Sequence, residues 1–115
     1  MNTLSPQSIS PLLPALERLV VYRKALALAR IVSSLHVGGP LGDQLLRAAQ
    51  SVVLNIAEGA GQASLPAKRR HYTIARGSAF EVAAALDLAP SEVGEDARGL
   101  LLEVTLMLTA LARGR

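Results

Sequence analysis

The sequence has no cysteine and very few aromatic residues. Its 115 residues include no Trp, two Tyr and one Phe. The lack of cysteine excludes disulfides, thiolate metal sites and a thiol nucleophile. The scarcity of aromatic rings leaves little surface on which nucleic-acid bases could stack.

The sequence also lacks an apolar run long enough to cross a membrane. The longest run, residues 99–112, contains Glu103 and is shorter than the roughly 20 residues that a spanning helix needs. The first residues do not combine a basic start with an apolar run, as a signal peptide would. We therefore expect a cytoplasmic protein that does not associate with a membrane.

Small and aliphatic residues dominate what remains. Hydrophobic residues make up 50% of the chain and aromatic residues only 3%, so leucine, alanine and valine supply most of the apolar content. This composition is typical of helix bundles, and the length allows one compact domain. The mean hydropathy of +0.34 indicates more apolar side chains than one small core can bury. We therefore expect a homo-oligomer.

Helical periodicity predicts an all-α protein made of a four-helix bundle. The predicted helices span about residues 15–36, 41–62, 65–89 and 92–112. Residues 1–14 contain three prolines and three serines, which oppose regular structure, so we expect a flexible N-terminal arm before a bundle over residues 15–115. Ser64 and Ser91 are the predicted caps of the third and fourth helices.

The apolar positions predict which side of each helix is buried. The first helix has two neighbouring apolar stripes, Leu19, Tyr22, Leu26, Ala29 and Ser33, and Val20, Ala27, Ile31 and Leu35. The second helix has one stripe, Leu45, Ala49, Val52 and Ile56, and the third has another, Tyr72, Ala75, Ala79, Val82 and Leu86. The fourth helix carries leucines on all sides, which indicates contact with a second subunit. Gly77, in mid-helix, suggests close approach of another helix.

A few polar residues interrupt these apolar helices in a regular order. They occur, along the chain, in Arg47-Ala48-Ala49, Asn55-Ile56-Ala57-Glu58-Gly59, Tyr72, Ala75-Arg76-Gly77-Ser78 and Glu81. This order resembles the four-helix-bundle proteins encoded in intervening sequences of bacterial 23S ribosomal RNA genes. The similarity covers about residues 16–112, and the segment 19–25 resembles the opening of that family.

The resemblance implies an architecture and an assembly. It implies an antiparallel up-and-down bundle that forms a homopentamer, and for most members no activity is established. Relatives include the accessory variability protein of diversity-generating retroelements, which associates with a reverse transcriptase and nucleic acid. We accordingly expect a non-enzymatic binding or scaffold protein without a cofactor.

The polar residues of the motif have two interpretations. The preferred one is a structural seam between the second and third helices, formed by Arg47, Asn55, Glu58, Arg76 and Glu81, in which Glu58 and Arg76 pair. The alternative is a small enzyme or ligand-binding protein with its site around Asn55, Glu58, Arg76 and Glu81. A metal site is not predicted, because neither His36 nor His71 follows a glutamate by three residues.

Basic residues form the main candidate binding surface. They are Lys68, Arg69, Arg70 and Arg76, with Arg23 and Lys24 as further members. Residues 1–76 carry nine Lys or Arg and three acids, whereas residues 77–115 carry three and six. The cluster could contact RNA or DNA, or a protein that binds them. A solvated face, or a contact with the acidic part of a neighbouring subunit, explains it equally well.

Overall fold

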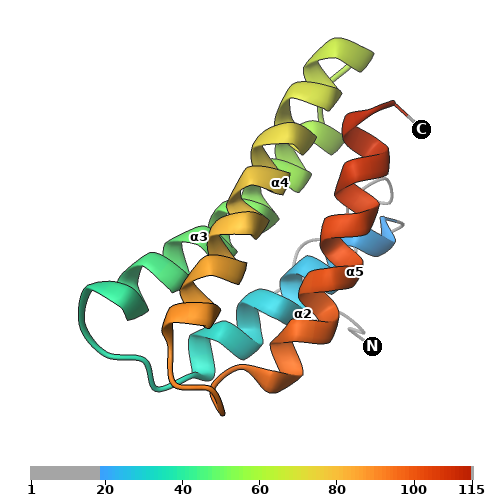
Figure 1. Ribbon diagram of the computed structural model, residues 1–115. Helices are drawn as coiled ribbons and strands as arrows, with labels where there is room; N and C mark the ends of the chain where they lie inside the picture. The colour runs from blue at the N-terminus through green and yellow to red at the C-terminus, as the bar shows by residue number, and fades with distance from the viewer. Residues whose placement is uncertain (1–18, 115) are drawn as a thin grey trace, which may run out of the picture.

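The protein is described by a computed structural model, which covers residues 19–114 (Figure 1). Four helices account for most of this range: α2 (Val20–Ser34), α3 (Gly39–Ala60), α4 (Leu65–Leu88) and α5 (Glu95–Ala112). Residues 19–114 contain no strand. The all-α prediction is therefore confirmed, while the predicted arm over residues 1–14 lies outside the described part of the chain.

The four helices pack side by side around one core. Each helix contacts two neighbours, in the cyclic order α2, α3, α4, α5 and back to α2. The contact between α3 and α4 is the most extensive, and Figure 1 shows these two long helices next to each other along their length. No helix within residues 19–114 is long and apolar enough to cross a membrane.

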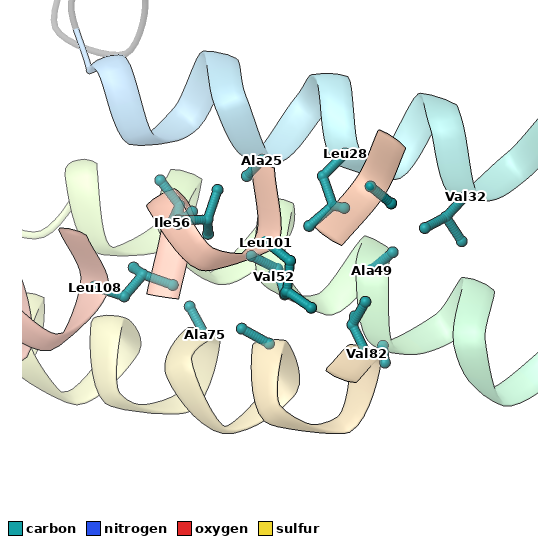
Figure 2. Close-up of a cluster of buried hydrophobic side chains, with 14 of the residues drawn as sticks. Ala25, Leu28, Val32, Ala49, Val52, Ile56, Ala75, Val82, Leu101 and Leu108 are labelled. Atoms are coloured by element: carbon teal, nitrogen blue, oxygen red, sulfur yellow. The ribbon is translucent and has the colours of Figure 1, made fainter. Parts of the chain in front are cut away.

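The core consists of aliphatic side chains from all four helices, and Figure 2 shows them meeting at the centre of the bundle. The stripes predicted for α3 and α4 are confirmed, since every residue in both is buried. On α5 the buried positions are Ala97, Leu101, Val104 and Leu108. Each fully buried leucine or valine contributes roughly 1.5–3 kcal/mol of transfer free energy, so this core is the main source of stability.

The prediction for α2 was wrong in its phase. Its buried residues are Val21, Ala25, Leu28 and Val32, which belong to neither predicted stripe. The helix is apolar on several sides, so its periodicity does not define a single inward face. Contact with both α3 and α5 selects the face between the two predicted ones.

The helix ends follow from local capping. Ser64 caps α4 as predicted, because its side chain accepts a hydrogen bond from the Ala67 amide at 3.3 Å. The Ser91 prediction was wrong: α5 begins at Glu95, and Ser91 instead donates to Glu92 Oε2 at 3.3 Å. Gly94 precedes α5 with φ of 76°, and a Cβ there would lie 2.6 Å from Leu86 Cδ2. Only glycine satisfies both conditions, which fixes the start of α5.

Candidate functional site

The α3–α4 interface contains a chain of polar side chains, which we call the α3–α4 seam. It consists of Ser51, Asn55 and Glu58 on α3 and of His71 and Ser78 on α4. The Oγ atoms of Ser51 and Ser78 are 2.7 Å apart. His71 Nδ1 lies 3.2 Å from Glu58 Oε2. The seam thus has one contact pair at each end, which holds α3 and α4 in register.

Asn55 connects the two ends of the seam. Its Nδ2 donates to the Ser51 carbonyl at 3.0 Å and to Ser51 Oγ at 3.2 Å. Its Oδ1 lies 3.4 Å from His71 Nδ1. The amide oxygen and the Glu58 carboxylate both accept hydrogen bonds, so the tautomer with the proton on His71 Nδ1 fits both contacts. The Ser51 hydroxyl is bonded to Ser78 and Asn55, so no histidine is placed to activate it as a nucleophile.

The predicted pairing of Glu58 with Arg76 was wrong. Glu58 contacts His71, whereas Arg76 Nε donates to Thr109 Oγ1 of α5 at 2.8 Å. The Arg76 guanidinium also lies over the Phe80 ring, 4.6 Å from its centroid. Positions 58 and 76 therefore lie on different sides of the bundle, because Arg76 projects from the side of α4 that faces α5.

Only part of the predicted polar seam comes together. Asn55 and Glu58 are members, but Arg47 is exposed on the outer side of α3, and Glu81 lines a separate shallow groove with Gln44 and Leu88. The four residues of the alternative site, Asn55, Glu58, Arg76 and Glu81, consequently do not share one pocket. No group of three or more potential metal ligands occurs among residues 19–114.

Sequence reasoning missed His71 and Ser78 as members of the seam. A signal for them exists, because Ser51 and Glu58 are seven residues apart on α3 and His71 and Ser78 are seven apart on α4. Seven residues make about two helical turns, so each pair lies on one helix face. Matching the two spacings predicts the contacts that the structure shows.

Gly59 of the motif has a packing role beside the seam. The ring of Tyr72 covers it so closely that a Cβ would lie 2.7 Å from Tyr72 Cε1. The ring is buried, and the loss of water around it raises the pKa of the Tyr72 hydroxyl. The end of α3 and the start of α4 are held together by this contact.

The basic residues do not form one continuous cluster. Lys68 Nζ donates to the carbonyls of Gly59 at 3.3 Å and Ala60 at 3.1 Å, so it caps the C-terminus of α3. Lys24 pairs with Glu103 of α5 at 2.5 Å. Arg23, Arg69 and Arg70 are exposed, and the Arg69 guanidinium lies against Gly114. The start of α4 therefore presents two basic side chains, Arg69 and Arg70, to solvent instead of the three that the sequence places there.

A second surface lies on the other side of α4. It is a groove of about 330 Å³ between α4 and α5, which we call the α4–α5 groove. Its apolar walls include Phe80 and Leu102, which are 52% and 61% exposed, and Ala83 also lines it. Arg98 Nη1 donates to Asp87 Oδ1 at 3.2 Å at one end. Large apolar side chains are thus left in water in the single chain.

Comparison with known proteins confirms the family resemblance. A search of curated protein sequences found no match to this chain. The sequence model of the 23S rRNA-intervening sequence protein family matches residues 17–94, which is more than half of the chain. The match includes the seam residues, Gly59 and Tyr72 together with α2, α3 and α4. The chain therefore belongs to the family of 23S rRNA-intervening sequence proteins.

Proposed function

We propose that this protein is a non-enzymatic, self-associating scaffold of the cytoplasm that binds nucleic acid through the exposed basic residues at the start of α4. The observation that carries the scaffold part is the exposure of large apolar side chains on α4 and α5. Phe80, Leu102 and Leu106 are 52%, 61% and 63% exposed. Contiguous apolar surface of this kind is typical of a protein interface.

The assembly that fits the family resemblance is a homopentamer of antiparallel up-and-down bundles. The seam supports an antiparallel orientation of α3 and α4. Ser51 contacts Ser78 while Glu58 contacts His71, so residue numbers rise along α3 as they fall along α4. The pentamer itself rests on the resemblance. Light scattering at micromolar concentration measures it directly, and a monomer at that concentration contradicts the scaffold proposal.

Arg69 and Arg70 carry the nucleic-acid part of the proposal. Both are exposed in the first turns of α4, whereas Lys68 and Lys24 hold carbonyl oxygens and a carboxylate of the same chain. Several copies in one assembly would repeat this basic pair and raise the apparent affinity for a polyanion. Binding would be independent of sequence, because the contacts are to phosphates.

Fluorescence anisotropy with RNA and DNA over a salt series tests this part. We expect Arg70→Glu to weaken binding about tenfold and to lower the salt slope by roughly one unit. Arg30→Glu is the matched control, because Arg30 is an exposed arginine of α2 near the other end of the bundle. Its affinity should stay within about threefold of wild type.

Two results would contradict the nucleic-acid proposal. The first is an absence of binding by wild type, which would leave a protein partner as the remaining ligand class. The second is equal binding by wild type and by Arg70→Glu, which would place the contact elsewhere. Neither result affects the self-association proposal, because the basic pair lies outside the α4–α5 groove.

A further inference from the structure

The outer face of α3 carries charged and apolar side chains in an order that matches one face of α4 in reverse. Arg47, Leu54 and Glu58 are all exposed on α3, and Leu54 is 60% exposed. They lie at intervals of seven and four residues, so they share one face of the helix opposite the buried stripe. We call this face the α3 ridge. A single protruding leucine thus stands between a positive and a negative end.

The groove shows the same pattern in reverse. On α4, Phe80 and Asp87 line the groove seven residues apart, and Arg76 stacks on the Phe80 ring from four residues before it. Arg76 covers the Phe80 ring, and the Asp87 side chain is 76% exposed. An apolar centre therefore again stands between a positive end and an end where the exposed Asp87 carboxylate pairs with Arg98.

The two patterns have the same length. Arg47 and Glu58 are eleven residues apart, as are Arg76 and Asp87. At 1.5 Å per residue both spans are about 16 Å. If the two helices lie antiparallel, Leu54 faces Phe80 while each charge faces its opposite. In the parallel orientation, like charges would face each other at both ends.

We propose that the α3 ridge of one copy docks antiparallel onto the α4–α5 groove of a second copy, with Leu54 on Phe80, Glu58 beside Arg76 and Arg47 beside Asp87. This inference rests on the self-association proposed above and names the two surfaces that meet. Glu58 and Arg76, which do not pair within one chain, pair between two chains.

The charged groups retain the capacity for these contacts. Arg76 uses Nε for Thr109, and its two terminal amino groups carry four further N–H donors. Glu58 contacts His71 through Oε2 and is exposed, and a carboxylate accepts several hydrogen bonds. Asp87 holds Arg98 through Oδ1 and accepts a second donor in the same way.

The docking joins two different surfaces, so it is head-to-tail. Every copy has one ridge and one groove, and successive copies continue until the rotation closes a ring. A pairing of two grooves would instead stop at a dimer. This difference makes the proposal testable by mixing variants.

The mixing experiment uses Leu54→Asp, which removes the ridge, and Phe80→Asp, which removes the groove. Both residues are exposed, so each variant should fold, and circular dichroism checks this. We expect each variant alone to be monomeric by light scattering, with an association constant lowered at least a hundredfold. An equimolar mixture should form a one-to-one heterodimer, because one intact ridge and one intact groove remain.

Charge exchange tests the register. Glu58→Arg and Arg76→Glu should each weaken association about tenfold, and the double variant should return to within about threefold of wild type. Glu81→Arg is the control, since Glu81 is an exposed acid of α4 outside the groove, and it should associate like wild type.

The outcomes separate this inference from the proposed function. A monomeric wild type contradicts both. A wild type that assembles while the mixture stays monomeric contradicts only the docking. Assembly by Leu54→Asp alone shows that grooves pair with each other, and additive loss in the charge double variant shows that the register is wrong.

Discussion

The two sides of α4 differ in which side chains they carry and in how those side chains are covered. The side that faces α3 carries His71 and the buried Ser78, and their polar groups are paired within the chain. The side that faces α5 carries Phe80, which remains half-exposed with Arg76 stacked on it. Buried polar groups need fixed partners, so the first side specifies how one subunit packs. Exposed apolar area gains free energy only when another surface covers it, so the second side is suited to assembly.

The largest expected effect is the difference between substituting a core leucine and a surface leucine of α5. Leu108→Ala removes a fully buried side chain and should lower the free energy of unfolding by about 2–5 kcal/mol. Leu106→Ala changes a side chain that is 63% exposed and should alter subunit stability by less than about 0.5 kcal/mol. Urea unfolding of both variants measures the difference. Equal losses would show that Leu106 belongs to the subunit core.

The next effect compares two glycines on the two sides of the subunit. Gly59→Ala places a methyl group against the buried Tyr72 ring and should cost about 1–3 kcal/mol. A Cβ at Gly77 meets no atom within 4 Å, so Gly77→Ala should stabilise α4 by about 0.5–1 kcal/mol. Thermal unfolding measures whether each substitution raises or lowers the stability. Destabilisation by Gly77→Ala would place a neighbouring subunit against that helix face and would support the expected close approach there.

A smaller effect tests the seam. Ser51→Ala removes the partner of the Ser78 hydroxyl and should cost about 1 kcal/mol. Ser51→Ala with Ser78→Ala should cost less than the sum of the single changes, because neither hydroxyl is then left without its partner. Denaturant unfolding of the full double-mutant cycle measures the coupling. Strict additivity would mean that the two hydroxyls do not interact.

The smallest effect is a dependence on alkaline pH. Burial raises the pKa of Tyr72, so above about pH 10 the unfolded chain loses this proton while the folded chain keeps it. The stability that depends on protonated Tyr72 is therefore fully present below pH 10, and it is lost as the pH rises through the pKa of Tyr72 in the folded chain. Tyr72→Phe should remove part of the alkaline decline in urea midpoint between pH 9 and pH 11. An identical decline in both proteins would contradict this assignment.

Much of the fold was predictable because local rules and core burial agree. Helices α3 and α4 each have a single apolar stripe, and these stripes are the buried faces. Ser64 caps α4 just before a proline, which the first turn of a helix tolerates. The α2 face was not predictable, because several sides of that helix are apolar. The start of α5 was also missed, since it depends on how closely Leu86 approaches Gly94.

The candidate site was predictable in its members more than in its contacts. Asn55 and Glu58 were singled out as polar residues among apolar ones, and both belong to the seam. Their partner His71 was considered as a metal ligand and not as a member of the seam, because the sequence shows neighbours along the chain and not across it. Arg76 was predicted to pair with Glu58 of α3, although it donates to Thr109 of α5.

The sequence by itself determined the helical class, two of the four buried faces and the family, because periodicity, capping and motif order are properties of neighbouring residues. The tertiary structure decided which polar groups meet. Glu58 and Arg76 lie 18 positions apart on adjacent helices, and the rotation of α4 turns Arg76 toward α5 and leaves Glu58 with His71. That rotation is set by how all the side chains of the core fill space together, which no local pattern contains.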